Sequence, residues 1–75
     1  PVSPQIAVGR AIRQHRRAAD LTQSDLAERV GVDVQTVCQW ERGNRRIAFL
    51  AVCAVAQVLG VPVAEFVPPS LATQP

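Results

Sequence analysis

The residues best suited to chemistry lie between two helix-capping residues, Asp33 and Gly43. Asp33 is a good N-cap and Gly43 a good terminator, so we predict a helix over residues 34–42. On a helical wheel Val37 and Trp40 share one side, whereas the opposite arc of about 140° carries mainly polar groups. The residues of this outer arc are Val34, Gln35, Cys38, Gln39 and Arg42. Because amides bond adenine, guanidinium groups bond phosphates and valine packs against a thymine methyl, this arc suits the edges of base pairs.

The residues before this helix predict another helix that crosses it. Thr22, with Asp25 three residues later, forms a capping-box-like pair that begins a helix ending near Arg29. Two helices that cross at roughly 90 to 120° need a small residue where they touch and a turn residue that accepts a positive φ. Ala27 and Gly31 meet these two needs. The spacing therefore predicts two crossed helices joined by a tight turn.

The remaining apolar residues predict further helical segments. One face of a first helix is marked by Val8, Ile12, His15 and Ala19. Its opposite face carries three arginines that we expect to be solvated: Arg10, Arg13 and Arg17. A fourth helix is expected over residues 47–59, where every residue except Gln57 is apolar, and residues 63–67 allow a last turn or two. The chain is therefore expected to be all-α.

The composition is that of one small folded domain. The chain has 75 residues, of which 48% are hydrophobic, and a net charge of +2, so it is too apolar and too weakly charged for a disordered protein. All eight basic residues are arginines, and the two cysteines are too few for a secreted disulfide scaffold. We expect tails at residues 1–5 and 68–75 around a domain at residues 6–67. The first apolar run lacks the basic leader of a signal peptide, so we expect a cytoplasmic protein.

No catalytic, metal or cofactor site is expected. No serine or cysteine has a base at a recognisable spacing, and the chain has no glycine-rich phosphate loop. His15 with Cys38 and Cys53 does not reproduce a zinc-binding spacing. Residues 47–67 are apolar enough to suggest a membrane span, but Gly60 and Pro62 interrupt them. We therefore expect neither an enzyme nor a membrane protein.

In this order and spacing the residues resemble the helix-turn-helix domain of the phage repressor and Cro family, often called the XRE family. The resemblance runs without a gap from about Val8 to Val67. It rests on Gly9, Arg16, Leu21-Thr22-Gln23, Leu26-Ala27, Val30-Gly31-Val32, Trp40-Glu41-Arg42-Gly43 and Leu59-Gly60-Val61. It implies a compact bundle of five helices that binds specific double-stranded DNA sequences as a dimer. The helix at residues 34–42 would enter the major groove, and we expect a transcriptional regulator that acts as a repressor.

The resemblance also assigns roles to individual residues. The base-reading positions are Val34, Gln35, Cys38 and Gln39. The positions that contact the DNA backbone are Gln23, Thr36, Asn44, Arg45 and Arg46. Arg16 and Glu41 match an ion pair that ties the first helix to the third. Cys38 is expected to be a small residue near the DNA rather than a redox sensor.

Three departures from the family pattern concern packing. His15 stands where the family prefers a core leucine, and Asp20 where it prefers glycine. The family register places one face of the fourth helix in the core: Phe49, Val52, Cys53, Ala56 and Leu59. Its other face includes Leu50, Ala51 and Ala54, and Leu50 and Ala54 stand where charged residues are usual. Such a face marks a partner surface or is covered by the tail, and we expect it, with the fifth helix, to pair with itself in a two-fold homodimer.

An alternative hypothesis gives the apolar face of the fourth helix a different role. The chain would then be a protein-interaction module, such as an antitoxin or an adaptor, with little DNA specificity. The segment after Val67 either leads to a further effector or sensing domain or is the natural end of the protein.

Overall fold

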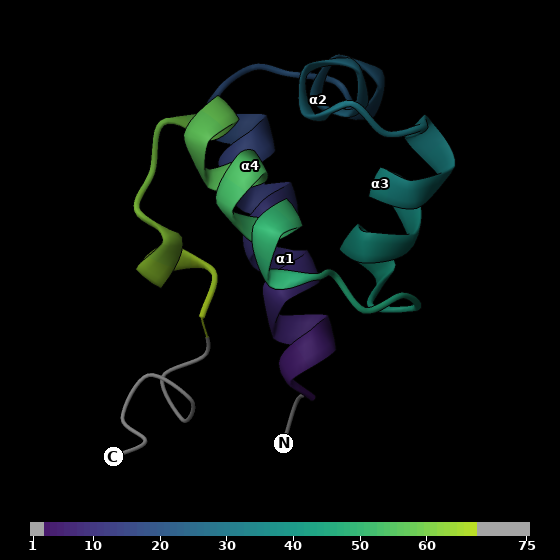
Figure 1. The fold of residues 1–75 in the computed structure, drawn as a ribbon, viewed down its shortest axis with the longest axis vertical. Coiled ribbons are helices and arrows are strands. Elements are labelled where there is room, and N and C mark those ends of the chain that lie inside the picture. Colours follow the sequence, from purple (N-terminus) through teal and green to yellow (C-terminus); the bar gives the residue numbers. More distant parts are fainter. Residues whose placement is uncertain (1–2, 68–75) are drawn as a thin grey trace.

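The computed structural model describes residues 3–67, which form helices and turns with no strand among them (Figure 1). The helices are α1 (Pro4–Ala18), α2 (Gln23–Val30), α3 (Val34–Arg42) and α4 (Phe49–Leu59), followed by the short 3-10 helix η1 (Val63–Glu65). In Figure 1 α4 lies over α1, α2 and α3 lie to one side of this pair, and η1 lies on the other side.

Local capping interactions begin α2 and α3 where the sequence predicts. The Thr22 hydroxyl accepts a hydrogen bond from the Asp25 backbone N–H, and the Asp25 carboxylate accepts one from the Thr22 N–H, each at 3.0 Å. This reciprocal pair confirms the predicted capping box. The Thr22 N–H lowers the pKa of Asp25 because it bonds the ionised carboxylate. α2 ends at Gly31, which takes the predicted positive φ of 89°.

The predicted five-helix bundle is wrong in its count, since the described residues hold four α-helices and one 3-10 turn. Only five residues separate Pro62 from Pro68, and proline cannot continue a helix, so no α-helix forms there. The 3-10 turn suffices to bring Phe66 into the core, where it is 2% exposed.

The predicted boundary of the N-terminal tail also needs correction. α1 begins at Pro4, where proline is tolerated because the first turn needs no N–H donor, and the Ser3 hydroxyl caps it at Ile6 N. The Gln5 side chain donates to the Gly43 carbonyl at 2.9 Å. Pro4 and Gln5 therefore belong to the folded unit. Residues 1–2 and the predicted tail at 68–75 lie outside the described residues.

The core lies where the four helices and the segment after η1 meet. It consists of Ile12, Leu26, Ala27, Val37, Trp40, Val55, Ala56 and Phe66. The rings of His15 and Phe66 pack in a T-shaped arrangement with their centroids 5.4 Å apart, and His15 Nε2 lies 3.7 Å from Glu65 Oε1. The histidine thus fills space where the family has leucine. Asp20 adopts a φ of 60°, the conformation for which the family uses glycine.

The orientation of α4 agrees with the predicted register in part: Ala56 is buried, and Val52 and Leu59 pack against the core. Phe49, expected in the core, is 69% exposed, whereas Val55 is fully buried. Cys53, also expected in the core, is only half-buried. An apolar residue at nearly every position leaves no periodic signal, so only packing against the other helices selects the buried face.

Gly9 sets how closely α1 approaches α3. A Cβ atom built on Gly9 would collide with the backbone oxygen of Trp40 and lie 2.9 Å from that of Glu41. Only glycine therefore lets α1 lie directly on the last turn of α3.

We expect Gly9→Ala to destabilise the domain by about 1–3 kcal/mol, because α1 must move away from α3. If helix propensity alone determined the effect, the change would instead add about 1 kcal/mol to the free energy of unfolding. Urea unfolding followed by circular dichroism measures the difference. Gly31→Ala is the comparison, since nothing lies within 4 Å of its added Cβ and only the positive φ is strained. A higher unfolding midpoint for Gly9→Ala than for wild type would contradict the close approach.

Candidate nucleic-acid interface

α3 is held by one face and exposes the other. Val37, Trp40 and Glu41 are buried against the rest of the domain. All four predicted base-reading residues lie away from this buried face: Val34 is 42% exposed, Gln35 and Gln39 are exposed, and Cys38 is half-buried. The outer arc predicted from the sequence is thus a single side of α3, on which Cys38 is the least exposed of these four residues.

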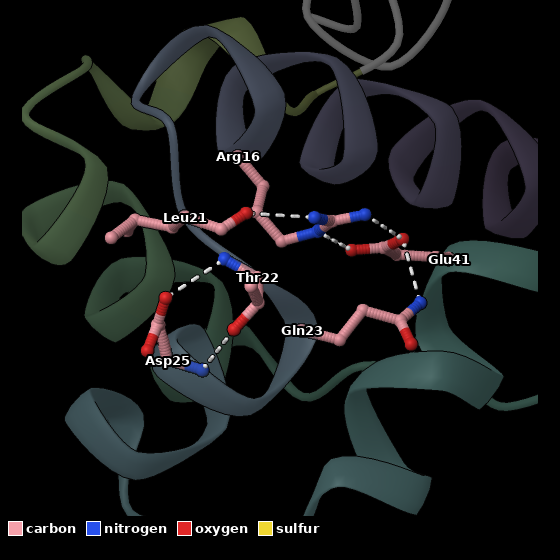
Figure 2. Close-up of polar contacts among 6 residues, drawn as sticks. All are labelled: Arg16, Leu21, Thr22, Gln23, Asp25 and Glu41. Atoms are coloured by element: carbon pink, nitrogen blue, oxygen red, sulfur yellow. Dashed lines mark hydrogen bonds and ion pairs between the residues drawn. The ribbon is translucent and has the colours of Figure 1, made fainter.

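A buried ion pair locks α1 to α3 (Figure 2). Arg16 Nε donates to Glu41 Oε2 at 2.6 Å, and Arg16 Nη2 donates to Glu41 Oε1 at 3.1 Å. Arg16 Nη1 also donates to the Leu21 carbonyl at 2.8 Å, which fixes the segment before α2. The hydrogen bond to Glu41 raises the pKa of Arg16, although burial acts in the opposite direction. The two residues that the family resemblance pairs are therefore in bidentate contact.

Gln23, the first residue of α2, joins this ion pair. Its Nε2 donates to Glu41 Oε1 at 3.0 Å, so one carboxylate oxygen accepts from two helices (Figure 2). The family resemblance assigns Gln23 a contact with a DNA phosphate. The sequence contains no pattern that predicts its hydrogen bond to Glu41. The contact becomes visible only when α1, α2 and α3 are packed together.

The loop after α3 folds back onto the start of that helix. Arg45 Nη1 donates to Thr36 Oγ1 at 3.2 Å, and Thr36 Oγ1 donates to the Asp33 carboxylate at 2.7 Å. The Thr36 hydroxyl lowers the pKa of Asp33, with the Thr36 backbone N–H as the next largest cause. Because the single hydroxyl proton of Thr36 is engaged by Asp33, Thr36 has no side-chain donor left, whereas Arg45 keeps further guanidinium N–H groups.

The other two predicted phosphate residues of this loop, Asn44 and Arg46, are exposed. The Asn44 backbone N–H closes α3 by donating to the Gln39 carbonyl at 3.0 Å. Arg46 lines an open groove with the first residues of α1 and with Ile47. The loop thus places Arg45 against α3 and Arg46 nearer the start of α1.

The apolar face predicted on α4 is only partly outward. Leu50 is 79% exposed and Ala54 is half-buried, whereas Ala51 packs against the core. Exposed Phe49 adjoins Leu50. The outward apolar face therefore consists of Phe49, Leu50, Cys53 and Ala54, and Ala51 is not part of it.

Comparison with known sequences shows to which family the chain belongs. The sequence pattern of a helix-turn-helix family matches residues 12–66, from the middle of α1 through η1. The chain belongs to the helix-turn-helix family of the phage repressor and Cro (XRE) type. α2, the turn at Gly31 and α3 form its helix-turn-helix motif.

Relatives of this helix-turn-helix chain include proteins described as regulators. It is 41% identical over 59 residues to an uncharacterised transcriptional regulator in the ATPase CF(0) region of Rhodospirillum rubrum, covering 79% of this chain and 55% of that protein. The chain thus spans about half the length of that relative. Other relatives are likewise described as HTH-type transcriptional regulators.

Solved structures show the same fold in two settings. The restriction-modification controller protein C.AhdI from Aeromonas hydrophila superposes with a TM-score of 0.79 at 29% identity, covering 83% of this chain and 94% of that one. Hydroxypropylphosphonic acid epoxidase from S. wedmorenis superposes with a TM-score of 0.80 at 23% identity, over 87% of this chain and 35% of the enzyme. The second likeness concerns the fold alone.

Residues 3–67 lack a membrane-spanning helix and a cluster of metal-binding side chains. No helix in this part of the chain is long and apolar enough to cross a membrane. The same residues contain no cluster of three or more histidine, cysteine, aspartate or glutamate side chains placed to hold a metal ion.

The ion pair leads to a stability prediction. Arg16→Met or Glu41→Leu alone should each cost about 3–5 kcal/mol, because the remaining partner is left charged and buried. Urea unfolding of both single variants and of the double variant measures this. The double variant should recover much of the loss, since apolar side chains of similar size then fill the site. Single variants as stable as wild type would contradict the burial of the pair.

Proposed function

We propose that this chain binds specific sequences in double-stranded DNA and is the DNA-binding part of a transcriptional repressor. The observation that carries the proposal is the outer side of α3, where exposed amides stand on a helix whose inner side is locked by Trp40 and Glu41. A rigid helix with exposed hydrogen-bonding side chains is what the major groove admits.

Base reading is assigned to four residues of α3. Gln35 and Gln39 are exposed and can each bond adenine at N6 and N7, and exposed Val34 can pack on a thymine methyl. Cys38 is small and half-buried, so it allows close approach of the DNA without forming a strong hydrogen bond.

Phosphate contacts are assigned to both ends of the motif. Gln23 lies at the start of α2, where free backbone N–H groups favour an anion. Arg45 lies against the start of α3, and Asn44 and Arg46 are exposed on the same loop. Thr36 supports this set through Arg45 rather than by donating its own proton, which Asp33 already accepts.

The outward apolar face of α4 supports pairing of two copies. Phe49 and Leu50 are the two most exposed large apolar side chains among the described residues. A two-fold dimer through this face would cover them and would present two copies of α3 to half-sites one helical turn apart, roughly 34 Å.

The test is selection of bound duplexes from a random DNA pool at about 150 mM salt, where nonspecific phosphate attraction is weak. We expect an enriched pseudo-palindrome with half-sites about 10 base pairs apart. Leu50→Glu is the matched variant, since it should select single half-sites and sediment as a monomer. Failure of the folded wild-type protein to enrich any sequence would contradict the proposal. Co-purification of a small partner would then favour the protein-interaction module.

Two substitutions separate base reading from phosphate binding. Gln35→Ala should relax the preference at one base pair and cost about 1–3 kcal/mol of binding free energy for the selected site. Arg45→Ala should weaken all sequences alike and lower the slope of log affinity against log salt by about one. Titration of selected and scrambled duplexes at several salt concentrations measures both effects. Equal losses on all sequences for both variants would show that Gln35 does not read a base.

A further inference from the structure

Glu41 makes more hydrogen bonds than the ion pair with Arg16 requires. Oε2 accepts from Arg16 Nε, whereas Oε1 accepts from both Arg16 Nη2 and Gln23 Nε2. The side chain of Glu41 is 3% exposed, so its carboxylate is held by protein groups rather than by water. Figure 2 shows the three side chains meeting, each from a different helix.

The charge of Glu41 determines which end of the Gln23 amide faces it. A carboxylate only accepts hydrogen bonds, so it pairs with the amide nitrogen and repels the amide oxygen. A glutamine on a free helix surface rotates among several orientations. Here the 3.0 Å bond to Glu41 holds one orientation, with one amide hydrogen engaged and the second free.

A phosphate oxygen is also only an acceptor, so the free hydrogen of Gln23 is the one it would bind. The approach of a phosphate to a buried carboxylate would normally be repulsive. Arg16 removes that obstacle, because it neutralises Glu41 through two hydrogen bonds. The set Arg16, Glu41 and Gln23 is therefore a fixed donor at the start of α2.

We propose that Glu41 is a positioning residue for DNA binding: its carboxylate, fixed by Arg16, orients the Gln23 amide so that its second N–H meets a backbone phosphate. The inference rests on the proposed function and deepens it. One buried carboxylate then serves both the packing of α1 on α3 and the contact of α2 with DNA.

The experiment is a double-mutant cycle on DNA affinity. Wild type, Gln23→Met, Glu41→Gln and the double variant are titrated with the selected duplex at a temperature where circular dichroism shows all four folded. Gln23→Met should weaken binding about tenfold, since it removes a hydrogen bond to a charged group. Its salt slope should equal that of wild type, because no positive charge is lost.

The cycle distinguishes positioning from a purely structural role. Glu41→Gln should weaken binding severalfold in the wild-type background and change it less than twofold in the Gln23→Met background. An equal loss in both backgrounds would overturn the proposal. If wild type binds no duplex, the proposed function and this inference both fail. If wild type binds and the cycle is additive, only this inference fails.

A second measurement needs no variant of Glu41 and keeps the proposal testable if Glu41→Gln does not fold. The side-chain amide signals of Gln23 in a ¹⁵N-labelled sample are assigned by their loss in Gln23→Met. We expect one proton shifted downfield and exchanging slowly with water, and the other shifting when duplex is added. Gln35 and Gln39, both exposed, are the matched controls in the free protein. A Gln23 amide that exchanges as fast as theirs would overturn the proposal.

Discussion

The guanidinium of Arg16 and the carboxylate of Glu41 meet where α1, α2 and α3 come together. Removing two charges from water costs several kcal/mol per ion, which is offset only when the geometry is good and the remaining polar atoms are bonded. Both conditions hold here, since the pair is bidentate and Arg16 also bonds the Leu21 carbonyl. A placement of α1 on α3 that kept one of these charges buried without the other would be unfavourable, so the pair disfavours other arrangements of these helices.

The exposed side of α3 follows from that arrangement. Gly9 lets α1 reach the backbone of the last turn of α3, and Trp40 and Val37 fill the core beneath. Rotation of α3 about its axis would bring Glu41 away from Arg16 and Trp40 into water. The amides of Gln35 and Gln39 are therefore exposed because the opposite side of the helix cannot move. A surface proposed to read bases gains its rigidity from contacts on the far side of the same helix.

α4 lacks polar contacts of the kind that fix the orientation of α3. It has no side-chain cap and no charged residue, and it packs on α1, α2 and η1. Space filling around Val55 and Ala56 selects its buried side and leaves Phe49 and Leu50 outside. The helix with the fewest polar contacts is thus the one that leaves an apolar surface exposed.

The sequence by itself determined the bounds of α2 and α3 and the outer side of α3. The reason is that caps such as Thr22 and Asp33 bond atoms three residues away, and helical periodicity depends only on neighbours. Only the tertiary structure decided which side of α4 is buried, that Gln23 bonds Glu41, and that Phe66 enters the core from a single turn. These three features depend on side chains that are distant along the chain and compete for the same space, so the local spacing of residues does not predict them.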